Sequence, residues 1–375
     1  MANSATRKPR PARQTRLPLP SPSRLAASLE EDSSERSRLA TTPDDKDKTF
    51  LYLAYGSNLC NETFRGRRGI KPLSQINVQV PELRVTFDLA GIPYLEPCFA
   101  NTARRQHRDD APTQLPLDAE KADLASSHWS EGGYRKDQWR KGLVGVVYEV
   151  TAEDYAHIIQ TEGGGSSYQD ILVDCHPIPG SDPAEPLPWH PTEPAFRAHT
   201  LFAPALPPHG GPLGGRVKRP DTSYAQASAR YLKLMRDGAA ELGLPYEYQE
   251  HLKSLRPYKI TTVRQRIGQA AFLLVWLPVV ALVFGLGKIF ADDRGRLPGW
   301  LRQFGNAVFS AVWTSYDNVF KPLYGDGERT ISDNIDLTGT EKGFSSGDMQ
   351  EMSRLVDVGL STELESISRQ VSRST

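Results

Sequence analysis

The 375-residue sequence is poor in cysteine and carries no excess of charge of either sign. Its three cysteines, Cys60, Cys98 and Cys175, form no CxxC pair and no disulfide framework, which fits a reducing compartment. Forty-five basic and 45 acidic residues cancel, so no global field points to a nucleic-acid partner. Walker loops, HExxH motifs and clusters of His and Cys are also missing, and we expect neither a metal nor another cofactor.

Large apolar residues are scarce at both ends of the sequence. Residues 1–48 are rich in Pro, Arg and Ser and contain no aromatic residue, so we expect a disordered N-terminal segment. The first 24 residues are Arg-rich and acid-free like a transit peptide, but their prolines disfavour the amphipathic helix that such a peptide needs. They contain no apolar h-region, which argues against a secretory signal. Residues 325–375, rich in Ser, Thr, Asp and Glu, are expected to be mostly disordered.

Between these ends, residues 49–260 alternate apolar runs with helical patterns and predict one folded domain. Residues 104–141 interrupt it with a polar stretch that we interpret as a surface insertion. We expect an α+β fold, a small mixed β-sheet or barrel with flanking helices. The predicted strands cover residues 50–55, 78–88, 143–150, 168–176 and 196–202, and the predicted helices 152–161, 224–242 and 245–255.

A membrane segment is expected after this domain. Residues 267–287 contain almost no charge and are long enough to span a bilayer, which predicts a single transmembrane helix; the alternative is a buried core helix. Basic residues are slightly more frequent before this run than after it, which favours a cytoplasmic position for the preceding domain. Residues 297–321 are amphipathic and too polar to span, and we expect a helix at the membrane interface or a hairpin partner of the first helix.

The most informative stretch opens the folded domain. Phe50 to Tyr55 form an apolar and aromatic run of strand length that leads directly into Gly56, Ser57 and Asn58. Glycine lets another group approach the main chain closely, and Ser and Asn are good helix N-caps. A strand that turns into a helix start presents main-chain N–H groups that suit a carboxylate or a phosphate. The alternative is an ordinary turn.

Three later pieces give this turn a context. They are the strand Gly145-Val-Val-Tyr-Glu-Val150, the pair Glu162-Gly163 at a helix end, and Gly243-Leu-Pro-Tyr-Glu-Tyr-Gln-Glu250. With the Tyr55-Gly-Ser-Asn58 turn, in this order and spacing, they resemble the γ-glutamylcyclotransferase family over roughly residues 50–257. The resemblance implies a lyase that cyclises the γ-glutamyl group of amino acids or peptides to 5-oxoproline and releases the amino acid.

The resemblance also implies roles for individual residues. Glu162 matches the family's catalytic glutamate, which would serve as general base and then general acid. Tyr224 matches a later tyrosine at the substrate; the alternative is a packing role at the start of a helix. The predicted substrate-binding residues are Tyr52, Leu53, Ala54, Tyr55, Gly56, Ser57 and Tyr224. A small-molecule γ-glutamyl compound is the expected substrate, and the sequence makes no prediction of oligomeric state.

Several alternatives stay open. Glu149, Glu153 and Glu96 compete with Glu162 for the role of catalytic carboxylate, and Ile159 stands where the family often has an acid. A glutathione-specific cyclotransferase is a second enzyme hypothesis, although that branch usually has another residue in place of Asn58. A membrane-tethered binding module of the same fold without turnover, and a scaffold whose functional part is 267–320, are non-enzyme hypotheses.

Overall fold

The fold is taken from a computed structural model of the chain. The structure describes residues 17–31, 48–105, 136, 139–161, 169–178, 182–202, 219, 221, 223–290 and 297–330. The central part of the predicted insertion, the pair Glu162-Gly163 and the C-terminal residues 331–375 lie outside the described residues.

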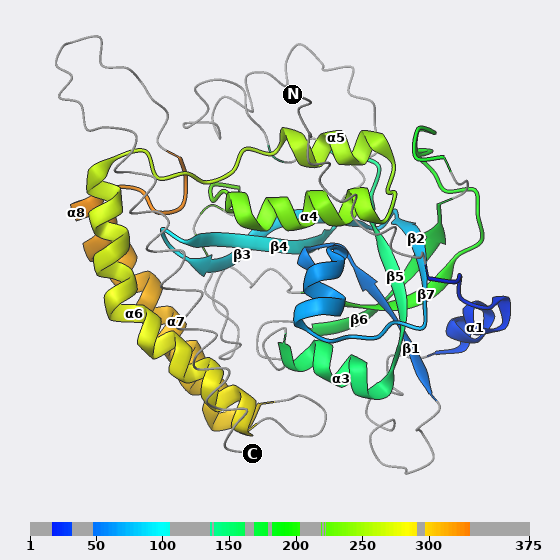
Figure 1. Ribbon diagram of the computed structural model, residues 1–375, viewed down its shortest axis with the longest axis horizontal. Helices are drawn as coiled ribbons and strands as arrows, with labels where there is room; N and C mark the ends of the chain where they lie inside the picture. The colour runs from blue at the N-terminus through cyan, green and yellow to red at the C-terminus, as the bar shows by residue number, and fades with distance from the viewer. Residues whose placement is uncertain are drawn as a thin grey trace, which may run out of the picture. The chain divides into compact units, whose positions relative to one another are not determined.

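A closed five-stranded barrel forms the centre of the domain, with strand order β1-β5-β2-β6-β7 (Figure 1). Its neighbours pair antiparallel, except that β1 and β7 run parallel where Tyr52 lies opposite His199. The predicted small barrel with flanking helices is therefore confirmed. Its strands are β1 (Thr49–Ala54), β2 (Ser74–Val80), β5 (Leu143–Thr151), β6 (Gln169–Pro177) and β7 (Phe196–Phe202).

The pairing of β1 with β7 closes the barrel, and strand β5 is apolar on both faces. Val146, Val147 and Tyr148 of β5 are fully buried, as expected for a strand that is covered on both sides. Phe64 stacks on Tyr148 with 4.5 Å between ring centroids. This aromatic contact fills the space next to the β1 turn.

A second, two-stranded sheet follows β2. It consists of β3 (Leu83–Ile92) and β4 (Glu96–Arg104), with Leu83 opposite Arg104 at its base. The sequence predicted one strand over 78–88; residues 78–80 and 83–88 are indeed in strands, but they belong to two strands separated by a turn, and β4 was not predicted. Pro81 cannot donate a ladder hydrogen bond, so the chain turns there and starts a new strand.

Three helices flank the barrel: α3 (Ala152–Thr161), α4 (Ala229–Glu241) and α5 (Tyr246–Ser254). Helix α4 starts later than the predicted residue 224 because Ser228 caps it, its hydroxyl accepting the Tyr231 N–H at 3.0 Å. Helices α4 and α5 lie side by side (Figure 1).

The N-terminal segment differs from the expectation of disorder over 1–48. Within it, residues 22–31 form a short helix α1 (Pro22–Ala27) and a 3-10 turn (Ser28–Glu30) that dock on β7. The Arg197 N–H of β7 donates to the Ser28 hydroxyl at 2.9 Å, and Ser28 is fully buried. Specific polar contacts order this segment, which composition alone does not reveal.

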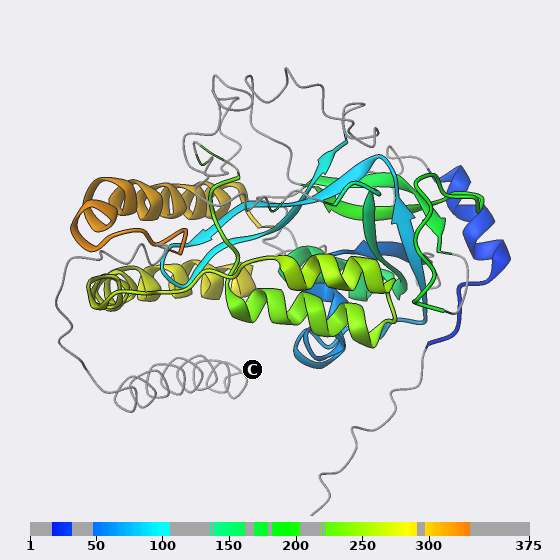
Figure 2. The same cartoon turned by 90° about the horizontal axis from the view of Figure 1, so that it is seen from above.

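Beyond residue 260 the chain forms a helical hairpin. Helix α6 (Val263–Phe290) packs against α7 (Gly299–Ser315), which continues through a π-turn (Tyr316–Phe320) into α8 (Lys321–Tyr324). Figure 2 shows α6 and α7 side by side, and the Trp276 indole of α6 donates to the Ser315 hydroxyl at 3.0 Å. The hairpin partner considered for residues 297–321 is therefore the arrangement found.

The hairpin is attached to the tip of the β3–β4 sheet. Tyr94 at this tip is 1% exposed, and its carbonyl accepts a bond from Gln269 of α6 at 2.8 Å. The Trp313 indole of α7 donates to the carbonyl of Gly91 at 3.1 Å. Residues 325–330, which the sequence assigned to a disordered tail, pack here as well, with Glu328 2% exposed. The second apolar core thus joins three distant parts of the sequence.

Among the described residues, α6 alone is long and apolar enough to cross a membrane. In the structure only 22% of its most apolar window is buried, so most of this surface is open. This is weak evidence for a membrane span, because a helix of a soluble protein can have the same length and composition.

Candidate functional site

A small cavity lies at the end of β1, where the predicted turn is. It encloses about 40 Å³. Five consecutive or nearly consecutive residues of the β1 end line it, together with three residues from other elements: Tyr52, Tyr55, Gly56, Ser57, Asn58, Ala100, Leu201 and Tyr231. The cavity therefore joins the β1 turn to β4, β7 and α4.

The turn is fixed by its own backbone and by two side chains. The Leu59 N–H donates to the Gly56 carbonyl at 3.1 Å and closes a 3-10 turn over Ser57–Leu59. The Tyr55 hydroxyl donates to the carbonyl of Leu201 on β7 at 2.9 Å, and the Asn58 amide donates to the Tyr52 hydroxyl at 2.9 Å. These bonds hold Tyr52, Tyr55 and Asn58 rigidly around the cavity.

Helix α4 supports the turn from its other side through a glycine. A Cβ at Gly238 would lie 2.4 Å from the carbonyl carbon of Leu59, so only glycine lets the helix backbone touch the turn. Tyr231, about two turns before Gly238 on the same helix, reaches the cavity. Its hydroxyl accepts the Ala100 N–H of β4 at 3.2 Å, and a Cβ on Gly56 would lie 2.9 Å from that hydroxyl. Gly56 therefore makes room for the Tyr231 hydroxyl.

The predicted site residues at the end of β1 fall into two groups. Tyr52, Tyr55, Gly56 and Ser57 line the cavity, whereas Leu53 and Ala54 are fully buried in the barrel core and do not line it. Their backbone positions the turn.

Tyr224 lies apart from the cavity. Its hydroxyl donates to Asp326, and the ammonium of Lys321 lies 4.8 Å from its ring centroid. Burial raises the Tyr224 pKa above its usual value, and the bond to Asp326 adds to this effect. The structure thus places Tyr224 against the segment after the helical hairpin, whereas Tyr231 of α4 lines the cavity.

Glu162 lies outside the described residues, but the preceding helix, α3, contacts a residue that lines the cavity. The Tyr155 ring of α3 lies 6.3 Å from the ring of Tyr52, which lines the cavity. Thr161, the last residue of α3, accepts a bond from Arg68 at 2.8 Å. Because Arg68 follows the β1 turn closely in sequence, the end of α3 is tied to the segment that leaves the cavity.

Two of the competing carboxylates, Glu149 and Glu96, accept hydrogen bonds from other side chains and do not line the cavity. Glu149 on β5 accepts bonds from the hydroxyls of Thr49 and Ser74 at 2.8 and 2.7 Å. Glu96 is 8% exposed and accepts from the Ser228 hydroxyl and the Arg230 guanidinium, both at 2.6 Å. Among the described residues, no Asp or Glu lines the cavity.

The described residues contain no group of three or more His, Cys, Asp and Glu side chains arranged to hold a metal ion. The polar residues that line the cavity are three tyrosines, Ser57 and Asn58, which carry hydroxyl groups and one amide. Such groups can bind a carboxylate and polarise a carbonyl.

Sequence reasoning missed Tyr231, Ala100 and Leu201 as cavity residues. Tyr231 lies within the helix predicted over 224–242, and nothing in its spacing separates a core tyrosine from one at a cavity. Ala100 lies on a strand that was not predicted, and Leu201 contributes through β7 pairing. The sequence contained no signal for either.

The chain is similar in sequence to proteins named gamma-glutamyl cyclotransferase. This chain is 27% identical over 278 residues to the gamma-glutamyl cyclotransferase gliK of Aspergillus fumigatus, covering 74% of this chain and 88% of the relative. It is 27% identical over 307 residues to the gamma-glutamyl cyclotransferase aclK of Aspergillus oryzae, covering 79% and 96%. Both relatives carry the name gamma-glutamyl cyclotransferase. A family model described as the AclK C-terminal domain matches residues 262–323, which include α6 and α7.

Solved structures give weaker likenesses. A gamma-glutamyl cyclotransferase structure is 18% identical, covers 57% of this chain and 92% of its own, and aligns with a TM-score of 0.36. The glutathione-specific enzyme of yeast is 15% identical, covers 55% and 95%, and has a TM-score of 0.31. The barrel described above is established by its own strand pairing, and the similarity in sequence is what relates this chain to cyclotransferases.

Proposed function

We propose that this protein is a γ-glutamylcyclotransferase. The observation that carries the proposal is the cavity at the β1 turn, in which Gly56 makes room for the Tyr231 hydroxyl beside Tyr52, Tyr55 and Ser57. The similarity to fungal gamma-glutamyl cyclotransferases over most of both chains supports it. The proposed reaction releases an amino acid or peptide and forms 5-oxoproline.

In the proposed mechanism the substrate supplies its own nucleophile. Its α-ammonium loses a proton, the amine nitrogen attacks the γ-carbonyl carbon, and a tetrahedral oxyanion forms. Main-chain N–H groups at Gly56 and Ser57 are the proposed donors to the glutamyl α-carboxylate and to this oxyanion. Collapse breaks the γ-amide C–N bond. The attacking nitrogen gives up its second proton to solvent and becomes the lactam N–H of 5-oxoproline, and the leaving nitrogen gains the proton with which it departs as an amine.

Glu162 is the proposed carrier of that proton. One carboxylate can accept a proton from the ammonium and return it to the leaving nitrogen. Tyr155 and Ile158 are buried on the barrel side of α3, and this helix ends at Thr161, directly before Glu162 in the sequence. No described carboxylate lines the cavity, which leaves the role open for Glu162.

The direct test is an assay of the full chain with γ-glutamyl-alanine and, separately, glutathione, in which 5-oxoproline is measured by mass spectrometry. We expect product from at least one donor, and the pair of donors separates a general from a glutathione-specific enzyme. Glu162→Gln should lower kcat by at least about 100-fold. Glu153→Gln, an exposed acid in the first turn of α3, is the matched control and should keep full activity.

The absence of 5-oxoproline from every γ-glutamyl donor would overturn the proposed activity. Unchanged turnover of the Glu162→Gln protein would overturn the role of this residue and leave the activity standing.

We also propose that α6 attaches the protein to a membrane, with the barrel domain on the cytoplasmic side. Leu274 and Phe284 on its open surface are 80% and 55% exposed, which is unusual for a soluble protein. Alkaline carbonate extraction of the full chain from cells tests this: retention in the pellet supports an integral helix, and complete release into the supernatant contradicts it.

A further inference from the structure

A second, larger cavity lies away from the candidate active site and shares no lining residue with it. It encloses about 180 Å³ between β3, the segment that leads into β5, and helix α5. Its volume exceeds the roughly 150 Å³ of an apolar cavity that is known to accept a benzene ring. The space is therefore sufficient for a small ring-containing ligand.

Four cations surround this cavity: Arg84, Arg105, Lys136 and Arg140. No Asp or Glu is among its described lining residues. The Lys136 ammonium is held at the edge by the carbonyl groups of Phe87 and Ala225, at 3.1 and 2.8 Å. Guanidinium groups offer planar pairs of N–H donors that match a carboxylate. The described lining therefore supplies guanidinium and ammonium donors that suit an anion.

Flat rings form the opposite wall. Trp139 lies 5.1 Å from Tyr248 in an edge-to-face arrangement and 5.6 Å from His251, measured between ring centroids. The Trp139 indole donates to the carbonyl of Gly142 at 2.6 Å, and Lys141 pairs with Glu247 of α5 at 2.8 Å. These contacts hold the aromatic wall in place before any ligand binds.

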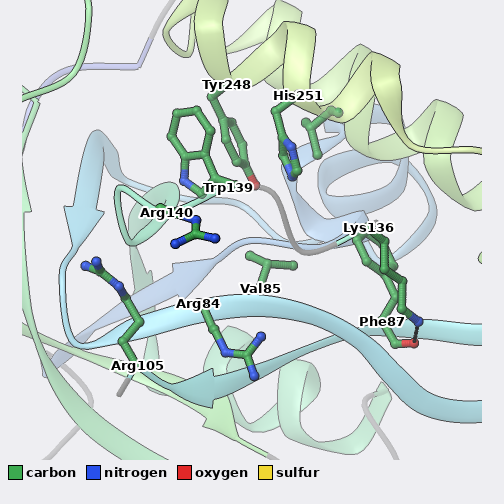
Figure 3. Close-up of a pocket in the computed structure, with 10 residues that line it drawn as sticks. Arg84, Val85, Phe87, Arg105, Lys136, Trp139, Arg140, Tyr248 and His251 are labelled. Atoms are coloured by element: carbon green, nitrogen blue, oxygen red, sulfur yellow. Dashed lines mark hydrogen bonds between the residues drawn. The ribbon is translucent and has the colours of Figure 1, made fainter. Parts of the chain in front are cut away.

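One buried polar group points into the cavity without a partner. The Tyr248 residue is 1% exposed, and its hydroxyl makes no hydrogen bond in the described structure. Figure 3 shows this hydroxyl directed from α5 toward the space above Val85, with Arg140 on one side and His251 on the other. A buried hydroxyl without a partner is rare and costly, and a ligand oxygen would satisfy it.

His251 adds an uncharged hydrogen-bond donor, the N–H of its imidazole ring. Burial lowers the His251 pKa to about 4, so the imidazole is uncharged near neutral pH. A neutral imidazole carries one N–H and leaves a flat face for stacking. Val85, Phe87 and Leu252 complete the lining with apolar surface.

We propose that this cavity binds a small aromatic carboxylate, with its ring against Trp139 and His251 and its carboxylate among the arginines. The Tyr248 hydroxyl donates to the same carboxylate. The site is independent of the proposed cyclotransferase chemistry, since none of its residues lines the cavity at the β1 turn.

The test is isothermal titration calorimetry of the full chain with benzoate as the probe. Benzamide keeps the ring without the charge, and inorganic phosphate keeps the charge without the ring. We expect saturable benzoate binding that weakens as ionic strength rises. Benzamide and phosphate should each bind at least tenfold more weakly.

Two variants locate the site. The double substitution Arg84→Gln and Arg140→Gln should weaken benzoate binding at least tenfold, and Tyr248→Phe should weaken it about three- to tenfold. Lys253→Gln and Tyr246→Phe are matched controls on α5, because both side chains are exposed and lie outside the cavity. Thermal melts monitored by circular dichroism establish that each variant is folded.

Three results would overturn the proposal. These are the absence of saturable benzoate binding, benzamide or phosphate binding as tightly as benzoate, and unchanged benzoate affinity in folded Tyr248→Phe and double-arginine variants.

Discussion

At the scale of single residues, the cavity at the β1 turn depends on one hydroxyl and one missing methyl group. Tyr231 contributes a hydroxyl that accepts the Ala100 N–H, and Gly56 leaves the space in which this hydroxyl lies. Gly56 lies at the end of a strand, where a glycine by itself would indicate a turn. Tyr231 lies on a helix face, where a tyrosine by itself would indicate a core position. Their role follows from the contact between them.

Removing the Tyr231 hydroxyl should affect activity more than stability. Tyr231→Phe keeps the ring, which packs edge-to-face on Phe99 with centroids 5.2 Å apart, and loses the bond to Ala100. We expect unfolding to become easier by about 1 kcal/mol and kcat/KM for the γ-glutamyl donor to fall by about 10- to 100-fold. Chemical denaturation and the 5-oxoproline assay measure the two effects. Tyr246→Phe, at an exposed position of α5, should leave both unchanged.

Two glycines should respond differently to a single added methyl group. Gly56→Ala meets the tip of the Tyr231 side chain at 2.9 Å and makes an ordinary contact with the Ala100 Cβ at 3.6 Å, so we expect a loss of activity with a stability change below about 1 kcal/mol. Gly238→Ala meets the Leu59 and Cys60 backbone at 2.4 to 2.6 Å and should destabilise the fold by about 3 kcal/mol. Urea denaturation of the two proteins, compared with turnover at 25 °C, tests the contrast. Equal stability losses would contradict this account of Gly56.

At the scale of elements, the N-terminal segment is held on the barrel by a buried histidine. His199 of β7 lies 2.9 Å from Asp170 on β6 and 3.5 Å from Glu31 at the end of the N-terminal 3-10 turn. Burial by itself lowers the His199 pKa, but hydrogen bonds to Asp170 and Glu31 outweigh it and raise the pKa to about 9. A charged His199 thus connects a segment that composition marks as disordered to the barrel.

The pH dependence of stability follows from this raised pKa. The unfolded histidine titrates near 6.5, so the stabilisation is complete below pH 6.5 and is lost as the pH rises through about 9. The shift corresponds to up to about 3 kcal/mol across this window. Urea denaturation of the full chain between pH 6 and 10 should show this decline, and His199→Gln should flatten it. His157→Gln, at an exposed position of α3, is the control and should keep the slope.

At the scale of the whole molecule, the barrel domain and the helical hairpin share one buried ionic cluster. Arg219 donates to Asp317 after α7 at 2.7 Å and to Glu328 at 2.6 Å, and its guanidinium lies 4.2 Å from the centroid of the Trp313 ring. Glu328 is 2% exposed, so its charge depends on this cluster for compensation. The segment before α4 and the end of the hairpin are thereby joined.

Removing only the cation should be more harmful than removing both charges. Arg219→Met leaves the buried Glu328 carboxylate with only the more distant Lys321 ammonium at 3.4 Å, and we expect a loss of about 3 to 5 kcal/mol. The double substitution Arg219→Met with Glu328→Gln should recover a large part of this loss. Guanidinium denaturation measures it, and Arg67→Met, which breaks an exposed pair with Glu62, should change stability by less than about 0.5 kcal/mol. A double variant as unstable as the single one would show that the cluster does not act as a charge pair.

The sequence by itself determined the elements with strong local signals. Strands β1 and β5 follow from uninterrupted apolar runs, α3 from its helical spacing, and the β1 turn from Gly56, Ser57 and Asn58, because backbone propensity and periodic burial act over a few neighbouring residues. The similarity to cyclotransferases also followed from motif order. Predictions for Glu162 and for the role of Ser57 remain predictions.

The tertiary structure alone decided which distant residues meet. Tyr231 rather than Tyr224 reaches the cavity, because Ser228 sets the start of α4 and Gly238 lets that helix touch the turn. The hairpin packs on the tip of β3–β4, and Tyr248 of α5 lines one cavity with Arg84, Arg105 and Arg140 from other parts of the chain. Such contacts depend on helix position and strand register over more than a hundred residues, which no local pattern encodes.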